Sequence, residues 1–332
     1  MKKYYLIFLV LFTAVLLFTS CGKKDETPAG SQNVNLIYKF EKGNKFRYKL
    51  TTILNTDESI KADSLMQVKS NQNDTYIVDF EVLDVDTDKI AELNATITSM
   101  NISVDNNGQQ LSFDPSKTPS KEEEQNFWQY AIQYNIPFRA RINRYGEVIE
   151  VSRLEKMIDK LVSLQPQQQT VTPEQKVKIS RDLAEQIVRP FTQLIFRQLP
   201  QKTLGKDSTW EKNYTSQMAV FKTNNTATYK VEDFIKLNDD NAVKVSINLT
   251  SIPEGENKGE QNGVKYNFED PKLSGNGSII FNIDKGLLAK SETQTTVELV
   301  ANLESKNTLQ KTVKSVRRDL STNKNIVELL PL

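Results

Sequence analysis

The sequence predicts an α+β fold in which an antiparallel β-sheet of two meanders carries about three helices, inserted centrally and covering one face. Apolar and polar residues alternate from Asn33 to Phe113 and again from Thr209 to the end, as in strands with one buried and one solvated face. Residues 115–200 instead show helix-start signals followed by apolar residues at helical spacing. We therefore expect a single β-rich domain over residues 34–332 with a helical insertion over residues 115–200.

The first meander is predicted from three alternating segments. Their apolar residues are Phe46, Tyr48 and Leu50, then Tyr76, Val78, Phe80 and Val82, then Leu93, Ala95 and Ile97. The alternation changes parity after Ile97, because the next apolar residues are Met100 and Ile102, so we expect a bulge or an offset between two strands. Asn107 and Gly108 follow and predict a tight turn.

Three capping boxes predict where the central helices begin. They pair Ser120 with Glu123, Ser152 with Glu155, and Thr172 with Gln175, the last with Pro173 at the first helical position. The apolar stripes behind them comprise Phe127 and Ala131; Leu154, Met157, Ile158 and Leu161; and Val177, Leu183, Ile187, Phe191, Leu194 and Ile195. We expect Pro190 to kink the third helix, residues 138–151 to form a hairpin around Gly146, and residues 165–169 to form a polar loop.

The second meander repeats the alternation. Asp284-Lys285-Gly286 predicts the turn of a hairpin, and residues 253–277, rich in Gly, Glu and Asn, predict a loop that interrupts the sheet. The two β regions resemble each other, since residues 43–48 and residues 205–210 each lead into an alternating strand. A duplicated meander and convergent β patterning both account for that similarity.

The N-terminus predicts export and lipidation. A basic start precedes an apolar run from Tyr4 to Phe18, which matches a signal peptide over residues 1–20 and is too short for a secure membrane span. Cys21, the only cysteine, stands where a lipoprotein signal peptidase cuts, so we expect cleavage before it and lipidation of its thiol; a plainly secreted chain is the alternative. Residues 21–33 then form a flexible tether. The expected location is the cell envelope, anchored in the outer membrane and facing the periplasm or the surface.

The composition excludes several classes of chemistry. The chain has no histidine, and lipidation would consume the thiol of Cys21, so the usual general base, the commonest metal ligands and a cysteine nucleophile are missing. Without Lys2 and Lys3 the chain holds 41 basic residues (43 − 2) against 42 acidic ones, which gives no nucleic-acid footprint. We therefore expect no enzyme, no catalytic residue, no cofactor, no metal and no nucleic-acid partner.

Residues 84–88 read Asp-Val-Asp-Thr-Asp, like the start of a calcium loop. Such a loop needs Gly at its sixth position and Glu at its twelfth, where this sequence has Lys89 and Ala95. We interpret the segment as a polar turn between two strands.

Aromatic residues gather on the first predicted helix. Phe127, Trp128, Tyr130 and Tyr134 are too many for one narrow buried stripe, so we expect some of them to line a groove or a partner surface; packing onto the sheet is the alternative. The residues assigned to a possible ligand groove are Phe127, Trp128, Phe191 and Ile195.

Two motifs carry a family resemblance. They are the opening Tyr38-X-Phe40-X-X-Gly43-X-X-Phe46-X-Tyr48 and the stretch from Leu199-Pro200 to Trp210, which Lys206 and Thr209 interrupt. They make the chain similar to an uncharacterised lipoprotein domain family of Bacteroidota, whose motifs imply structure and no catalytic residues. The order of strands, helices and strands also resembles periplasmic lipoprotein carriers and lipid-binding lipoproteins, which implies a curved sheet, an open half-barrel, with helices on its concave face.

The alternation pattern supports the same arrangement, because strands with one apolar face need a cover and amphipathic helices need a sheet. An imperfect cover would leave an apolar groove. We therefore expect a membrane-anchored lipoprotein that binds or carries a lipid or another apolar ligand; the alternative is a surface-exposed scaffold with no small ligand and an unknown protein partner. A continuous apolar cavity favours carriage, whereas a filled core with an exposed aromatic patch favours a scaffold.

Overall fold

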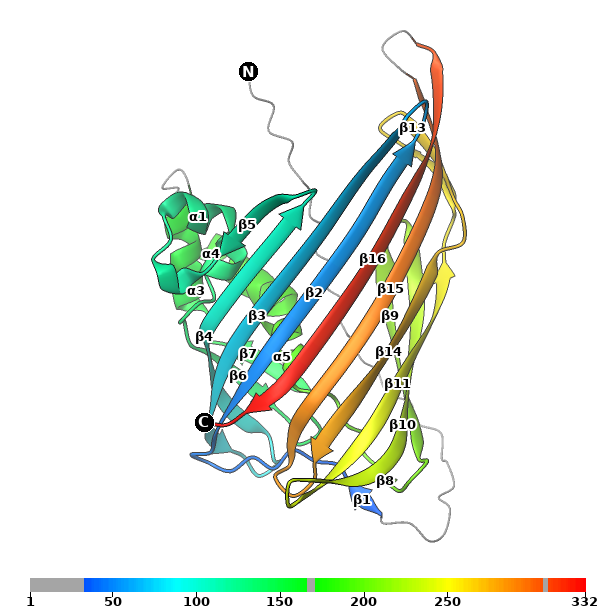
Figure 1. The fold of residues 1–332 in the computed structure, drawn as a ribbon. Helices are drawn as coiled ribbons and strands as arrows, with labels where there is room; N and C mark the ends of the chain where they lie inside the picture. The colour runs from blue at the N-terminus through cyan, green and yellow to red at the C-terminus, as the bar shows by residue number, and fades with distance from the viewer. Residues whose placement is uncertain (1–32, 166–170, 307–309) are drawn as a thin grey trace.

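The computed structural model describes residues 33–165, 171–306 and 310–332, which form a long curved antiparallel sheet with helices beside it (Figure 1). The predicted signal peptide, Cys21, nearly all of the predicted tether and most of the loop predicted over residues 165–169 lie outside the described residues. A small second sheet pairs β1 (Val34–Asn35) with β8 (Thr203–Leu204).

Two meanders make up the main sheet. The first comprises β2 (Lys45–Lys61), β3 (Leu65–Val85), β4 (Ala91–Asn106), β5 (Gln109–Phe113), β6 (Phe138–Ile142) and β7 (Val148–Ser152). The second comprises β9 (Thr209–Met218), β10 (Phe221–Leu237), β11 (Asp240–Glu254), β12 (Lys258–Gln261), β13 (Val264–Phe268), β14 (Lys272–Asn282), β15 (Leu287–Lys306) and β16 (Thr312–Leu330). The strand order β7-β6-β4-β3-β2-β16-β15-β14-β11-β10-β9 joins the meanders where β16 pairs with β2 and leaves the sheet open between β7 and β9. The predicted antiparallel meanders are confirmed.

The irregularities predicted in the first meander are present. Val78 pairs with Ile97 whereas Ile77 pairs with Ser99, so Thr98 is the extra residue of a bulge in β4. This bulge is what changes the parity of the alternation. The turn at Asn107-Gly108 and the β6–β7 hairpin around Gly146 are also confirmed.

Residues 84–88 form the predicted turn, between β3 and β4. The Asp86 carboxylate accepts hydrogen bonds from the backbone N–H groups of Asp88 and Ile90, both at 2.9 Å. This carboxylate therefore holds its own turn, as aspartate commonly does.

The helical region begins with η1 (Pro115–Lys117) and continues as α1 (Lys121–Asn126), α2 (Trp128–Ala131), α3 (Glu155–Leu164), α4 (Pro173–Leu183), the π-helical turn η2 (Ala184–Val188) and α5 (Arg189–Ile195). The capping boxes of Ser120 and Thr172 are confirmed. The box at Ser152 is wrong, because Ser152 still belongs to β7 and α3 starts after Leu154 without a side-chain cap. The π-helical turn η2 ends at Val188, two residues before Pro190, where the sequence predicts a kink.

Two further expectations are wrong. Val177 does not belong to the buried stripe of the third helix, since its side chain is 71% exposed and burial begins at Leu183. Residues 253–277 do not interrupt the sheet as a loop, because β12 and β13 form a hairpin that pairs with β15. At Gly259 in β12 the ring of Tyr266 on the facing strand occupies the space of a Cβ, so a larger residue there would displace this ring.

An aromatic cluster fills the concave side of the sheet at one end, here called the closed end. Phe196, which follows α5, is fully buried at its centre. Its ring centroid lies 5.2 to 6.2 Å from those of five rings, Tyr38, Phe40, Phe46, Tyr48 and Phe80. The cluster therefore joins the N-terminal segment, β2, β3 and the helical region into one core.

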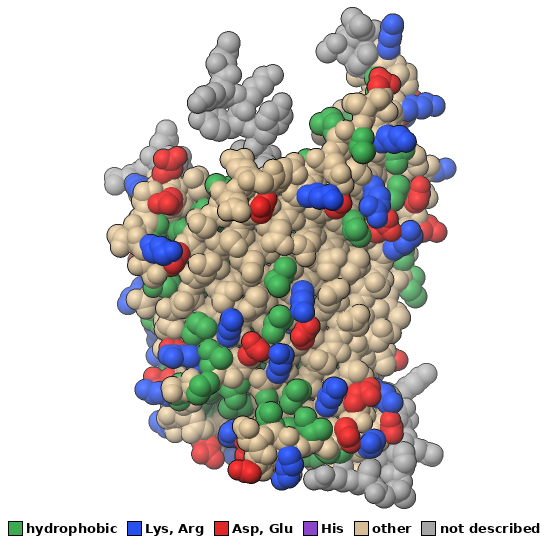
Figure 2. Space-filling model, viewed as in Figure 1, with side chains coloured by type: hydrophobic (Ala, Val, Ile, Leu, Met, Phe, Trp, Pro, Cys, Tyr) green, Lys and Arg blue, Asp and Glu red, His purple; other side chains and the backbone are tan. Residues whose placement is uncertain are grey.

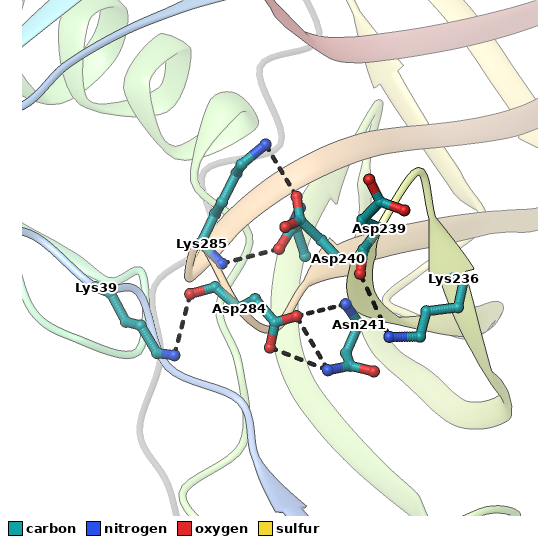
Figure 3. A network of polar contacts seen from close by, with 8 residues as sticks. Lys39, Lys236, Asp239, Asp240, Asn241, Asp284 and Lys285 are labelled. Atoms are coloured by element: carbon teal, nitrogen blue, oxygen red, sulfur yellow. Dashed lines mark hydrogen bonds and ion pairs between the residues drawn. The ribbon is translucent and has the colours of Figure 1, made fainter.

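Polar contacts at the same end tie two turns together (Figure 3). The Asp284 carboxylate accepts from the backbone N–H of Asn241 at 2.6 Å and from its side-chain amide, which links the β14–β15 turn to β11. Lys285 pairs with Asp240 at 2.9 Å, and hydrogen bonding to Lys285 lowers the pKa of that carboxyl group. Lys39 donates to the backbone oxygen of Asp284, so the N-terminal segment is attached as well.

Replacing Phe196 by alanine is expected to lower the free energy of unfolding by about 3–5 kcal/mol, because it leaves a cavity among five aromatic rings. Urea denaturation followed by circular dichroism measures this. Val177→Ala, at the exposed position of α4, is the control and should change the stability by less than about 0.5 kcal/mol. Equal effects of the two substitutions would contradict the central role of Phe196.

Gly146→Ala is expected to destabilise the protein more than Gly108→Ala. Both glycines have positive φ, +82° and +85°, so alanine strains the backbone at both positions by about 1–2 kcal/mol. At Gly146 the added Cβ would also overlap the Arg197 carbonyl and the Tyr38 ring, whereas nothing lies within 4 Å at Gly108. Chemical denaturation gives the free energy of unfolding of both variants, and the difference between them measures the cost of this overlap. Equal losses of stability would show that the overlap costs nothing.

Candidate functional site

A cavity of about 1680 Å³ lies on the concave side of the sheet, beyond the aromatic cluster. Its walls are the inner faces of β2, β3, β15 and β16, the edge strand β9 and its neighbours, and α5 with η2. Residues that pair side by side across β2, β16 and β15 form rows along the inner face. The core ends at the row Leu50–Val327–Ser291, whose three residues are all buried. The next row, Thr52–Asn325–Thr293, belongs to the cavity lining, so the cavity starts where the inward residues change from apolar to polar.

The cavity extends toward the other end of the sheet, here called the open end. β2, β3, β15 and β16 continue there beyond α5 (Figure 1). Over much of the outer surface of the sheet, Figure 2 shows few hydrophobic or charged side chains.

One side of the cavity is an apolar wall supplied by the second meander. Its apolar side chains include Met218, Leu249, Tyr266, Phe268, Val297, Leu299, Ala301 and Leu303, and the polar Asn276 and Thr295 also belong to the lining. Residues 297–303 contribute at every second position of β15, because side chains of a strand alternate between the two faces of the sheet. This wall is an elongated apolar surface.

The opposite side belongs to β2, β3 and β16 and is richer in polar side chains. These are Thr52, Thr56, Ser70, Gln72, Ser321, Asn323 and Asn325, with the apolar Leu54, Val68 and Leu320 among them. Thr52 donates to the side-chain oxygen of Asn325 at 2.9 Å. The side-chain oxygen of Asn323 is buried and has no hydrogen-bond partner among the described residues. The cavity is thus amphipathic across its width.

Asp74 is a buried acid at the edge of this lining. Its carboxylate accepts from Gln72 Nε2 at 2.9 and 3.0 Å and from the Tyr130 hydroxyl at 3.3 Å. Burial raises the pKa of Asp74 to about 6, against the opposing effect of these hydrogen bonds. No basic side chain forms an ion pair with it in the part of the chain that the structure describes.

Arg197 lies at the boundary between the cavity and the aromatic cluster. Its backbone N–H donates to the Tyr38 hydroxyl at 3.0 Å, and that hydroxyl donates to the Arg197 carbonyl. Its guanidinium donates to the Ser291 hydroxyl from Nε at 3.1 Å and to the Thr293 hydroxyl from Nη2 at 3.3 Å. Burial lowers the pKa of this guanidinium, which nevertheless stays charged at neutral pH.

The other two arginines of the lining are neutralised by carboxylates. Arg189 pairs with Glu185 at 3.0 Å and donates to the backbone oxygens of the edge strand β7. Arg317, toward the open end, pairs with Glu58 at 3.1 Å and with Asp319 at 3.0 Å. These two arginines therefore have structural roles.

The segment that carries α5 also covers the unpaired edges of the sheet. Gln193 accepts from the backbone N–H of Val148 and donates to the backbone oxygen of Gly146, both next to or within β7. Gln198 accepts from Lys212 of the other edge strand, β9, at 3.0 Å. Side chains of this segment thus span the opening between β7 and β9 at the closed end.

The structure places the four predicted groove residues apart. Phe191 lines the cavity and its ring lies 5.2 Å from that of Tyr76. Ile195 is fully buried, and Phe127 stacks on Phe113 at 5.2 Å, so neither belongs to the lining. Trp128 is 41% exposed and also lies outside it. A ligand role of these residues stays a prediction, and Cys21 lies outside the described residues.

Sequence reasoning missed Asp74 and Arg197. Asp74 could have been found, because it has the parity of the inward residues Tyr76 and Val78, and a carboxylate at an inward position is unusual. Arg197 follows the last helix in a segment without periodicity. Its place inside the cavity depends on contacts with residues far away in the sequence.

Residues 88–288 match the model of a family described as a family of unknown function, DUF6263. No curated protein sequence matches the chain. Of the described residues, no helix combines the length and apolar character needed to cross a membrane, and no group of acidic side chains could hold a metal ion.

Two solved structures illustrate how weak the structural likenesses are. One, described as lipid-protein interactions in lipovitellin, is 11% identical with a TM-score of 0.43, and the match covers 88% of this chain but only 26% of that one. The other, OccK7 (OpdD) of Pseudomonas aeruginosa, is 8% identical with a TM-score of 0.24, covering 87% of this chain and 100% of that one. These scores are too low to support a shared function.

Asp74→Asn is expected to change how stability depends on pH. In the folded protein the Asp74 carboxyl has a pKa of about 6, above its ordinary 3.8, so stability falls as the pH rises through this interval and the carboxylate ionises. The difference between these two pKa values corresponds to about 3 kcal/mol of stability at pH 8. This is the upper limit for the stability that Asp74→Asn regains.

Urea denaturation at pH 4 and pH 8 tests this expectation. The asparagine variant should gain stability over the parent chain only at pH 8, while Asp63→Asn, at the exposed β2–β3 turn, controls for the loss of one carboxylate. The same gain at both pH values would mean that ionisation of Asp74 has no part in it.

Proposed function

The chain belongs to the DUF6263 family of unknown function, and we propose that it is a lipid-anchored protein of the cell envelope whose cavity binds or carries a lipid or another apolar ligand. The observation that carries this proposal is the cavity, about 1680 Å³ with an elongated apolar wall. Sites for small molecules usually measure about 300–1,000 Å³. The volume therefore suits a ligand with a long hydrocarbon chain.

Apolar side chains facing an open cavity favour such a ligand. Removing apolar surface from water contributes about 25 cal/mol per Å², so a hydrocarbon chain along residues 297–303 of β15 would gain free energy in proportion to its contact area. The other side of the cavity is polar, which suits a ligand that has a polar group as well.

The membrane anchor is part of the proposal and rests on the sequence. An N-terminal signal peptide over residues 1–20 and the single Cys21 support lipidation at that cysteine. A cysteine that carries several acyl chains would hold the protein stably at a membrane. The proposed location is therefore the cell envelope, with the outer membrane as the expected site of anchoring.

The proposed role is binding and not catalysis. The chain has no histidine, and Cys21 would be consumed by lipid. The acids of the cavity lining have structural partners, as Asp319 has in Arg317.

A second candidate, an interaction protein, is supported by apolar side chains exposed at the open end. These are Leu65 and Met66 at the β2–β3 turn, Leu111 of β5, Ile252 of β11 and Val316 of β16. Exposed apolar residues grouped at one end of a molecule commonly mark a contact with a partner or a membrane.

We expect the unlipidated Cys21→Ser chain, purified without detergent, to bind the neutral dye N-phenyl-1-naphthylamine with an increase in fluorescence. Leu299→Asn should weaken this binding about tenfold, because it removes an apolar side chain from the wall. Val300→Asn is the matched control, since its side chain points to the opposite face of β15 and lies outside the lining. If the chain binds no dye, or if both variants have equal effects, the result would contradict ligand binding in the cavity and favour the interaction protein.

Labelling cells with an alkyne analogue of palmitate is expected to modify the chain through Cys21 and not the Cys21→Ser variant. The reason is that acylation follows cleavage before that cysteine, as the sequence predicts. Gel fluorescence after coupling to a dye measures the label. Equal labelling of both chains, or none of either, would remove the anchor from the proposal.

A further inference from the structure

An unpaired positive charge faces the cavity at its closed end. Of the three arginines in the lining, Arg189 and Arg317 are ion-paired, whereas Arg197 forms no ion pair with any described residue. Among the residues that the structure describes, its guanidinium donates hydrogen bonds to the hydroxyls of Ser291 and Thr293 alone. Both are neutral acceptors, so the charge itself is not compensated.

The acidic side chains nearby in the lining do not compensate this charge either. Glu147 accepts from the side-chain amide of Asn143 at 2.9 Å and forms no ion pair with Arg197. Asp74 is held by Gln72 and by the Tyr130 hydroxyl and forms no ion pair with Arg197 among the described residues.

Arg197 is partly buried, and a cation withdrawn from water without an anion is unfavourable unless something else supplies the negative charge. A guanidinium also presents several N–H groups in a plane that matches the two oxygens of a carboxylate or phosphate. The surroundings suit such a head group, because hydroxyl and amide side chains form the adjacent row of the cavity. The unpartnered oxygen of Asn323, one row farther toward the open end, could accept from a hydroxyl of the same ligand.

We propose that the cavity takes an amphiphile with an anionic head group, a carboxylate or a phosphate, held by Arg197 at the closed end. The hydrocarbon chain of this ligand lies along the apolar wall of β15 and points toward the open end. This inference rests on the proposed function and specifies its ligand class. From Thr293 to Leu303 the strand advances about 33 Å, enough for a long chain to lie extended.

Displacement of N-phenyl-1-naphthylamine from the Cys21→Ser chain tests the ligand class without any change at Arg197. Dodecanoate and dodecyl phosphate are expected to displace the dye at concentrations at least about tenfold lower than dodecanol does, whereas acetate and inorganic phosphate do not displace it. Equal potency of dodecanol would overturn the inference. Tight binding of acetate or inorganic phosphate would show that Arg197 binds free anions, and it would overturn the proposal of an amphiphilic ligand.

Variants of the arginine test its role. Arg197→Gln should abolish the preference of the chain for the two anionic amphiphiles over dodecanol, a loss of about ten- to a hundredfold. Arg197→Lys, which keeps the charge, should retain part of the preference. Arg318→Gln, which removes a positive charge from the opposite face of β16, should leave it intact.

These results separate the two proposals. Dye binding with no effect of Arg197→Gln on selectivity would overturn the inference and leave the apolar cavity standing. Absence of dye binding to the parent chain would overturn the proposed function itself. The urea midpoint of each variant shows whether it is folded. If Arg197→Gln does not fold, the comparison of dodecanoate with dodecanol on the parent chain still decides the inference.

Quenching by bromine tests the orientation of the ligand. Trp210 stacks on Tyr229 of the cavity lining, with ring centroids 5.0 Å apart, and Trp128→Phe leaves it as the only tryptophan. Bromine next to the carboxylate, in 2-bromododecanoate, should quench this tryptophan more strongly than bromine at the far end, in 12-bromododecanoate. The reverse order would show that the head group lies at the open end.

Discussion

The structure depends on filling the concave face of a strongly curved sheet. Most inward side chains at the closed end are apolar. A curved sheet cannot bury these side chains against itself, so another element must supply the contact. Phe196 and the helix before it supply it, with Tyr38 and Phe40 of the N-terminal segment on the other side. The aromatic rings meet at 5 to 6 Å, in the range of favourable ring pairs.

The same constraint explains the cavity. Along β2, β15 and β16 the buried core reaches only to the row of Leu50 and Val327. Beyond this row the inward residues of β2 and β16 are mostly threonine, serine and asparagine, which tolerate water. Those of β15 are Thr293 and Thr295 in the next two rows and become apolar from Val297 to Leu303. The inner face is therefore polar next to the core and apolar farther along β15, and this asymmetry is what an amphiphile would match.

The arginines of the cavity lining also differ in how their charge is compensated. Carboxylates compensate the arginines that hold the fold together, at the edge strand β7 and near the open end. Arg197 is different because its backbone fixes Tyr38 while its side chain reaches into the cavity. Because the backbone of Arg197 makes the contact with Tyr38, its guanidinium is available for another partner.

The sequence by itself determined the order of the elements. Alternation identified the two meanders, the change of parity after Ile97 identified the bulge, and two of three capping boxes identified helix starts, because each of these features is set by residues close together in the chain. Local signals failed where distant residues decide: β7 continues through Ser152, and the glycine-rich segment forms the β12–β13 hairpin because it pairs with β15.

Only the tertiary structure decided where the core ends and what lies inside the cavity. Ile195 and Phe191 occupy the same predicted stripe, yet one is buried in the core and the other lines the cavity, since the sheet covers them to different extents. Arg197 meets Ser291 and Thr293 across more than ninety residues, a proximity set by how the sheet curves around α5. Spacing along the chain carries no information about such contacts, because they depend on the packing of whole elements.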